Sequence, residues 1–270
     1  LIENGFSLLF GAFYFKDEEL YTKAHKIITE QLQEQILDDG GHFELSPMYH
    51  QIILDRLLDC INLLQNNQRF DNQENLLKKM EEKASKMICW LNQITFSNGE
   101  IPMLNDSAPG IAPTTKQLND YAIRLGITTE ATIREIRQNS CNSYSLKESG
   151  YRKYSTPNYE CLIDVGRIGP SYQPGHAHAD IFNFVLNIHN DSLIIDTGIS
   201  TYEACNQRVW ERSTQAHNTV TINDKNSSQV WSAFRVGKRA HVTLLKEDRN
   251  DILGRHNGFN KAFHFRQWNF

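Results

Sequence analysis

The spacing of apolar residues changes once along this chain, and that change restricts the folds open to it. In residues 46–64 the apolar positions are 53, 54, 57, 58, 61 and 64, the pattern of a helix with one buried face. From about residue 151 the period becomes two, in short segments rich in β-branched and aromatic residues. Because helical segments precede strand segments and do not alternate with them, the sequence predicts an α+β protein made of two units.

The first unit is predicted to be helical. Ser46 is a favourable N-cap for the helix of residues 46–64, and Pro47 suits its first position. Further amphipathic helices are predicted at residues 17–36, 75–94, 116–127 and 129–139. The connections 37–44 and 96–115 are rich in Gly, Asp and Pro, as loops are. Successive helical hairpins of this kind would build either a helical toroid or a bundle.

The second unit is predicted to be an antiparallel β-sandwich. Its short strands are separated by turn sequences such as residues 189–191 and 223–225. The predicted strands are residues 161–169, 182–189, 192–198, 218–224, 240–248 and 261–268. The polar segment 141–158 has no apolar period, and the boundary is placed in it, around residues 141–155. We therefore expect a helical domain over 1–145 and a sandwich domain over 146–270.

Composition excludes some partners. The net charge is −4 and the pI about 6.2, which does not favour binding to nucleic acid or to an anionic membrane surface. No apolar run approaches the ~18 residues of a transmembrane helix. The five cysteines have no metal-type spacing and are interpreted as small buried residues. The chain begins at Leu1 within an apolar segment, so we expect it to be part of a longer protein. Nothing in the sequence indicates the oligomeric state.

Three histidines and one aspartate are candidates for a metal site. His176 and His178 lie two apart in "GHAHAD", and on a strand both would point to one face. His217 is predicted to start another strand, and Asp196 ends an apolar run, where a charge needs a partner. Two imidazoles and a carboxylate from His178, Asp196 and His217 would suit Zn²⁺.

Two other interpretations of these residues stay open. The same side chains could form a hydrogen-bonded structural cluster. Alternatively, His178, Asp180 and His217 match the two-histidine, one-carboxylate pattern of non-haem iron oxygenases.

Tyr49 is a candidate of another kind. It lies in the first turn after Ser46 and Pro47, where free N–H groups and the helix dipole favour negative charge. It could hold an anionic substrate or form a phenolate, or it could be an amphipathic tyrosine that packs at a helix end.

Three segments together resemble a known family. The stretches "GGHFELSPMYH", "GHAHADIFNFVL" and "RVWERSTQAHNTVTIND" are similar to motifs of the heparinase II/III-like polysaccharide lyases. In that family a helical toroid precedes an antiparallel β-sandwich, which is the order of units predicted above. The resemblance extends over nearly the whole chain.

The resemblance implies a role for each motif residue. It makes Tyr49 and His176 the catalytic acid/base residues, and it makes His178, Asp196 and His217 the ligands of a mainly structural zinc ion. The family also uses an asparagine or histidine from its helical part. We expect that residue ahead of Leu1, because Asn4 is a poor match.

The implied activity is β-elimination on a uronic-acid-containing acidic polysaccharide, such as a glycosaminoglycan. A base removes the C5 proton of the uronate, and an acid protonates the glycosidic oxygen that leaves C4. The alternative is a catalytically silent glycan-binding or polysaccharide-export-associated protein with this fold. The family also implies a periplasmic or secreted location.

An acidic polysaccharide needs positive charge and sugar contacts. Arg212, five residues before His217, and Tyr202 are the predicted substrate-binding residues. Further positive charge could come from Arg208, Arg235, Lys238 and Arg239, although the "RVGKR" group of residues 235–239 could instead be solvated at a sandwich edge. The remaining candidates, which could stack on sugars or lie in the core, are Trp210 and Trp231.

Overall fold

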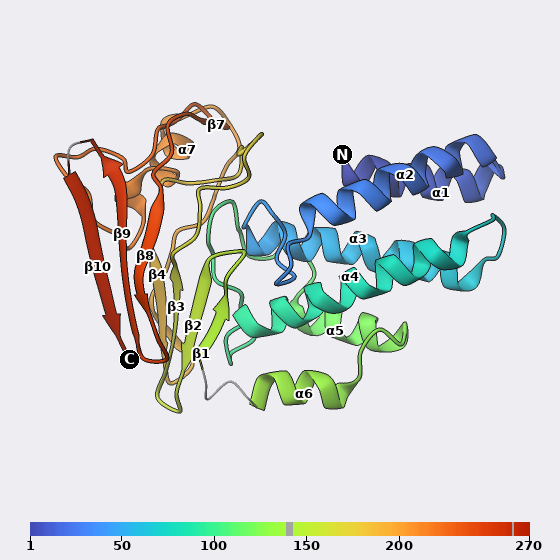
Figure 1. Cartoon of the computed structure of the whole chain (residues 1–270), viewed down its shortest axis with the longest axis horizontal. Helices are drawn as coiled ribbons and strands as arrows, with labels where there is room; N and C mark the ends of the chain where they lie inside the picture. Colours follow the sequence, from blue (N-terminus) through green and yellow to red (C-terminus); the bar gives the residue numbers. More distant parts are fainter. Residues whose placement is uncertain (139–142, 261) are drawn as a thin grey trace.

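The structure is a computed structural model that describes residues 1–138, 143–260 and 262–270. Helices occupy one end of the molecule and strands the other (Figure 1). The helices of the first part are α1 (Ile2–Phe15), α2 (Glu18–Gln35), α3 (Pro47–Asn66), α4 (Gln73–Ile94), α5 (Thr115–Arg124) and α6 (Glu130–Gln138). Strands follow from Ser143 onward.

Helix α3 illustrates how the sequence sets these elements. The Ser46 side chain accepts a hydrogen bond from the Tyr49 amide at 3.3 Å, and Pro47 occupies the first turn, as predicted. One face of the helix, which includes Leu54, Leu57 and Ile61, is buried in the helical core. The start of α3, which carries Tyr49, is therefore fixed by its cap and by its packing.

The strands form two main sheets and a small hairpin. The first sheet has the order β1-β2-β3-β4-β5 and the second the order β10-β9-β8, and all recorded pairings are antiparallel. The strands are β1 (Ser143–Leu146), β2 (Tyr151–Ser155), β3 (Tyr159–Asp164), β4 (Phe184–Ile188), β5 (Asp191–Ile194), β8 (Val242–Glu247), β9 (Asp251–Phe259) and β10 (Ala262–Asn269). The hairpin pairs β6 (Val230–Trp231) with β7 (Arg235–Val236). The α+β prediction, with a helical part followed by a sandwich, is confirmed.

Several local predictions were wrong. Residues 218–224 do not form a strand, and within them only Ile222 makes an isolated bridge, to Lys225 just beyond the segment. Strands β1 and β2 lie inside segment 141–158, which lacked an apolar pattern. In β2 every residue is buried although Arg152 and Lys153 are charged, because each has an acidic partner. Strand β9 and the short helix α7 (Asn206–Glu211) were not predicted either.

The first sheet is covered on both faces. Tyr151, Leu162 and Val185 belong to the core shared with the helices. Their alternating neighbours Cys161 and Ile163 belong to a second core, which faces β8–β10. The sheet therefore lies between the helical part and the outer sheet, as Figure 1 shows.

A buried ion pair fastens the helical part to this sheet. Lys153 Nζ lies 2.8 Å from Glu160 Oε1 and donates to the Thr95 carbonyl at the end of α4 at 2.7 Å. Glu160 also accepts from the Ser97 amide at 2.7 Å. The loop that leaves α4 is thus held against β2 and β3.

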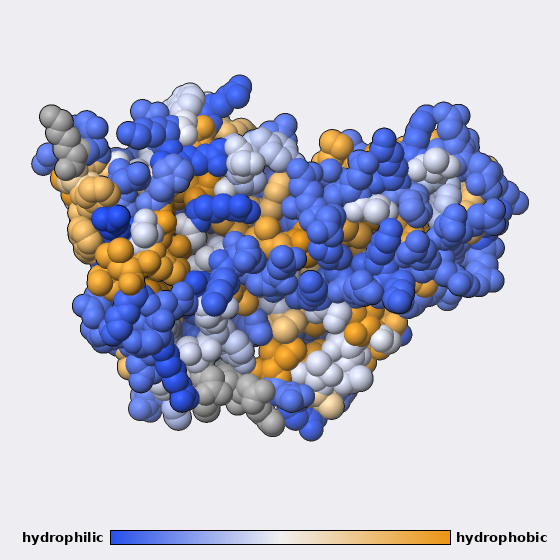
Figure 2. Space-filling view, viewed as in Figure 1, coloured by the Kyte–Doolittle hydropathy of each residue, from blue (hydrophilic) through white to orange (hydrophobic). Residues whose placement is uncertain are grey.

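The surface differs between the two ends of the molecule. Hydrophilic residues dominate the helical end, whereas a hydrophobic area lies at the strand end (Figure 2). Exposed apolar side chains of the outer sheet include Leu245, Phe263 and Phe265. Within the described residues, no helix has the length and apolar character needed to cross a membrane.

The cysteines that the structure describes are free thiols. Cys60 and Cys161 are buried, as predicted, whereas Cys89 and Cys205 are half-buried. Cys141 lies outside the described residues, as do residue 139 of the last predicted helix and Lys261 of the last predicted strand.

Candidate active site

The loop between α2 and α3 delivers Glu44 and Tyr49 to the junction of the two parts. Gly40 turns this loop at φ +94°, and a Cβ there would lie 2.2 Å from the Lys86 carbonyl oxygen, so only glycine fits. Ser46 Oγ donates to the Asp106 carbonyl at 2.8 Å, which ties the start of α3 to the loop after α4.

The "GHAHAD" segment is an irregular loop and not the predicted strand. Its backbone is held by the loop after α4: the Asp106 amide donates to the His176 carbonyl at 3.2 Å, and the His178 amide donates to Asn105 Oδ1 at 3.0 Å. These contacts replace a strand ladder. His176 and His178 consequently do not share one face, since His176 is half-buried at the junction and His178 is fully buried.

Tyr49, His176 and Tyr202 meet at the junction. The Tyr49 and His176 rings stack with centroids 4.0 Å apart and an interplanar angle of 8°. The Tyr49 and Tyr202 hydroxyl oxygens are 2.8 Å apart. His176 Nδ1 lies 3.0 Å from Glu44 Oε2. Three predicted site residues from three distant segments are thus adjacent, together with Glu44, which was not predicted although it lies in the "ELSPMYH" motif.

The surroundings bias the protonation of these groups. Partial burial raises the pKa of Tyr49, the hydrogen bond from Tyr202 opposes this, and the charges of Asp106 and Glu44 add to the rise. For Glu44, burial raises the pKa, but the hydrogen bond with His176 and the nearby His42 lower it below its ordinary value. At neutral pH Tyr49 is therefore a phenol and Glu44 a carboxylate.

A buried network of hydrogen bonds around Asp106 and Arg208 lies next to the site. Arg208 Nη2 donates to Asp106 Oδ2 at 2.7 Å, its Nη1 donates to Asp106 Oδ1, and its Nε donates to the Ala233 carbonyl at 2.9 Å. His178 Nε2 lies 2.8 Å from Asp106 Oδ1. The Arg208 guanidinium lies 5.3 Å from the ring centroids of Tyr202 and of Phe234. Asp106 was not predicted, because it lies 102 residues from Arg208 and in none of the three motifs. Arg208 lies in the "RVWERSTQAHNTVTIND" motif and was predicted only as a source of positive charge for the polysaccharide, not as the partner of Asp106.

The three predicted metal ligands lie next to this network. His217 Nδ1 is 2.8 Å from Asp196 Oδ2, and the rings of His178 and His217 are 5.2 Å apart. His178 Nδ1 and His217 Nε2 are buried and have no hydrogen-bond partner. In the described part of the chain, however, no group of three or more His, Cys, Asp or Glu side chains is arranged to hold a metal ion. The three predicted ligands are therefore neighbours in the structure without forming such a group.

Sequence-family comparison identifies the chain. The heparinase II/III N-terminus model matches residues 12–124, and the heparinase II/III-like, C-terminal model matches residues 140–270. The chain belongs to the heparinase II/III-like family. The predicted resemblance is confirmed.

The relatives and solved structures agree with this membership. A heparin-sulfate lyase of Bacteroides stercoris is 24% identical over 242 residues, which cover 84% of this chain and 35% of that protein. A heparin-sulfate lyase of Pedobacter heparinus is 23% identical over 228 residues, 78% of this chain and 33% of that protein. The crystal structure of heparinase III matches with a TM-score of 0.76 and 18% identity, over 99% of this chain and 44% of that one. The chain thus spans about a third of the length of these curated relatives.

Within this heparinase II/III-like chain, the two predicted substrate-binding residues differ in position. Tyr202 is 41% exposed at the junction. Arg212 is fully buried, and its guanidinium donates to the carbonyls of Ala177, Ser232 and Arg235. Arg212 therefore joins the "GHAHAD" loop to the β6–β7 hairpin and does not reach the surface.

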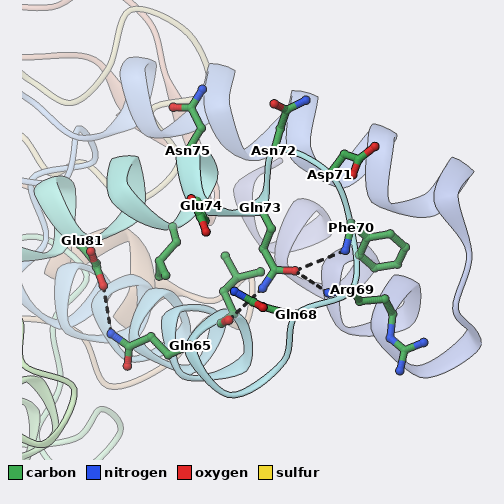
Figure 3. A pocket seen from close by; sticks show the side chains of 12 residues that line it. Gln65, Gln68, Arg69, Phe70, Asp71, Asn72, Gln73, Glu74, Asn75 and Glu81 are labelled. Atoms are coloured by element: carbon green, nitrogen blue, oxygen red, sulfur yellow. Dashed lines mark hydrogen bonds between the residues drawn. The ribbon is translucent and has the colours of Figure 1, made fainter.

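A pocket of about 900 Å³ at the far end of the helical part carries no comparable chemistry. It lies beside the α3–α4 turn and is lined mainly by amide and charged side chains (Figure 3). Gln73 uses its amide there to bind the turn, accepting from the Arg69 amide at 3.2 Å and donating to the Leu64 carbonyl at 2.8 Å. The candidate active site is therefore at the junction of helices and sheet.

Proposed function

We propose that the protein is a polysaccharide lyase that cleaves a uronic-acid-containing acidic polysaccharide by β-elimination. The observation that carries this proposal is the stacked Tyr49–His176 pair, with Tyr202 hydrogen-bonded to Tyr49. Two ionisable side chains whose rings stack with centroids 4.0 Å apart could act on neighbouring atoms of one sugar residue. The heparin-sulfate lyase relatives support this class of reaction.

The geometry suggests how the two roles are divided. Glu44 lies at His176 Nδ1, so Nδ1 carries the proton and Nε2 is left as the base. Tyr49 keeps its proton at neutral pH and is the acid. His176 takes the C5 proton, the C5 electron pair forms the C4–C5 double bond, the C4–O bond breaks, and Tyr49 protonates the leaving oxygen. Each such group is worth roughly 10²–10⁴ in rate.

An ultraviolet assay tests this function. The elimination product is a conjugated unsaturated uronate, which absorbs in the ultraviolet. We expect the full-length protein to generate that absorbance on at least one acidic polysaccharide, with heparan sulfate as the first probe. Binding of these polymers without any unsaturated product would instead support the silent glycan-binding alternative.

The proposal includes a mainly structural zinc ion held by His178, Asp196 and His217. The support is the hydrogen bonding of the two imidazoles: each directs one ring nitrogen at a carboxylate, Asp106 or Asp196, and leaves the other buried without a partner. A histidine that has one ring nitrogen held by a carboxylate and the other left free is typical of zinc sites. The ion would join the "GHAHAD" loop to the segments that carry Asp196 and His217.

Metal analysis of variants tests the zinc site. His178→Ala should lose zinc and lower the melting temperature, whereas His176→Ala should keep zinc and lose turnover. Equal zinc loss in both variants would contradict this division. Asp180 is buried with Oδ2 unpartnered and is the competing carboxylate. If Asp180→Asn loses the metal and Asp196→Asn keeps it, the ligand set must change and the oxygenase-type grouping gains support.

We also propose a periplasmic or secreted location, because there the enzyme would encounter extracellular acidic polysaccharides. Cell fractionation with an antibody against this chain would test it. Recovery in the cytoplasm alone would contradict the proposal.

A further inference from the structure

A second cavity lies beside the β6–β7 hairpin, away from the catalytic pair. Its volume is about 790 Å³. It is lined by segment 225–231, by Lys238 and Arg239 after β7, and by residues 257, 258 and 260 at the end of β9. These elements all belong to the sandwich part.

The lining of this cavity suits an anion. Among the described residues that line it, none is acidic, although the chain as a whole has a net charge of −4. Lys225 and Lys238 are exposed, and Arg239 is half-buried and bound to backbone carbonyls of residues 168–171. Side-chain amides that can pair with sugar hydroxyls complete the lining, on Asn226, Gln229, Asn257 and Asn260, next to the buried Ser227 and Ser228.

Trp231 adds an aromatic surface to the cavity. Its side chain is 50% exposed. A Cβ on Gly237 would lie 2.8 Å from the Trp231 ring, so this glycine lets the indole rest against the backbone of β7 and its connection. The Gln229 amide donates to the Lys238 carbonyl and the Gly237 amide to the Gln229 carbonyl, both at 2.8 Å, which holds the two sides of the hairpin together. The indole is thus held in place with one side open.

The hairpin connects this cavity to the active site. Its tip residue Phe234 stacks on Tyr202 at 5.8 Å and lies 6.4 Å from His176, both between ring centroids. Trp231 and Phe234 are three residues apart, so their Cα atoms are separated by at most about 11 Å. A polymer bound at Tyr49 and His176 could therefore continue over the tip of the hairpin into the cavity.

We propose that this cavity is an accessory subsite for an anionic sugar unit of the polysaccharide, with Lys225 and Lys238 binding its acidic group and Trp231 stacking on its ring. The ligand class rests on the proposed function, whereas the cavity and its charge do not. The subsite would hold the polymer while the catalytic pair acts on another unit of the same strand.

The experiment compares binding and cleavage in two variants. The variants are Lys225→Gln/Lys238→Gln and Trp231→Ala in the full-length protein, with long-chain heparan sulfate and a heparan sulfate tetrasaccharide as probes. Calorimetry gives the dissociation constants, and ultraviolet absorbance gives the cleavage rates. Matched controls are Lys26→Gln/Lys78→Gln, which removes two exposed lysines on α2 and α4, and Phe265→Ala, which removes an exposed aromatic on β10.

We expect both subsite variants to bind the polymer roughly fivefold to tenfold more weakly, while tetrasaccharide binding and the control variants stay unchanged. Unaltered polymer binding in both variants would overturn the proposal, and so would a parent protein that binds no acidic polysaccharide. If polymer binding weakens as expected but no variant forms unsaturated product, the subsite stands and the lyase function fails.

Discussion

The side chains proposed to be catalytic depend on neighbours that are distant in sequence. Tyr49 lies between His176 and Tyr202, which are 127 and 153 positions further along the chain. Glu44 orients His176 across 132 positions. Family motifs identified Tyr49 and His176, and Tyr202 was predicted from its place in the loop after Asp196. No spacing rule links Glu44 to His176, because their contact depends on how the two loops fold.

Replacing Glu44 tests its role as a positioning residue. In Glu44→Gln the carboxylate that fixes His176 is lost, so we expect kcat to fall by roughly 10–100-fold with little change in KM. Glu44→Asp should recover part of the rate. A fall in KM and kcat together, or a lower melting temperature with unchanged kcat, would assign Glu44 a structural role only.

Asp106 is the residue whose loss should most destabilise the site. It is fully buried and neutralises Arg208, so Asp106→Asn leaves an uncompensated buried charge. We expect the free energy of unfolding to fall by about 3–5 kcal/mol in urea denaturation. The exposed Asp71→Asn should stay within about 0.5 kcal/mol of the parent protein. A similarly small effect at Asp106 would contradict the network described.

At the scale of elements, the spacing of apolar residues predicts helices and strands that bury one apolar face. It misses elements that bury charged side chains. Helix α3 was predicted because its cap and its apolar stripe are both local signals. Strand β2 was missed because Arg152 and Lys153 are buried against Glu247 and Glu160, partners from other strands. The "GHAHAD" loop was mistaken for the start of a strand because its histidines alternate with alanines. The structure shows that this alternation also occurs in an irregular loop, in which His176 and His178 have different surroundings.

The Lys153–Glu160 pair predicts a pH dependence of stability. Burial raises the pKa of Glu160, but Lys153 and the Ser97 amide lower it by more than burial raises it. The pKa of Glu160 is therefore below its ordinary value. The stabilisation is therefore fully present above the unfolded-state pKa of about 4.3 and is lost as pH falls through the lower folded-state pKa.

Urea unfolding as a function of pH checks this dependence. Glu160→Gln should cost about 3–5 kcal/mol near neutral pH, and the difference from the parent protein should shrink below about pH 4. Glu82→Gln, at an exposed position on α4, is the matched control and should show no such dependence. A difference that is independent of pH would exclude the ion pair as its source.

For the molecule as a whole, the order of the two parts was predictable and their junction was not. The change of period along the chain indicates helices followed by a sandwich, which the structure and the family membership confirm. The junction forms because β1–β5 cover the helical core with one face and the outer sheet with the other. The proposed catalytic pair lies there, with Tyr49 from α3 and His176 from a loop of the sandwich.

The most direct test of this account is the rate of unsaturated uronate formation by Tyr49→Phe and His176→Ala, compared with the full-length parent protein on its best acidic polysaccharide. We predict a loss of roughly 10²-fold or more in kcat for each variant, with polymer binding and melting temperature retained. Parent-like rates in either variant would contradict the assignment of Tyr49 and His176 as the acid–base pair.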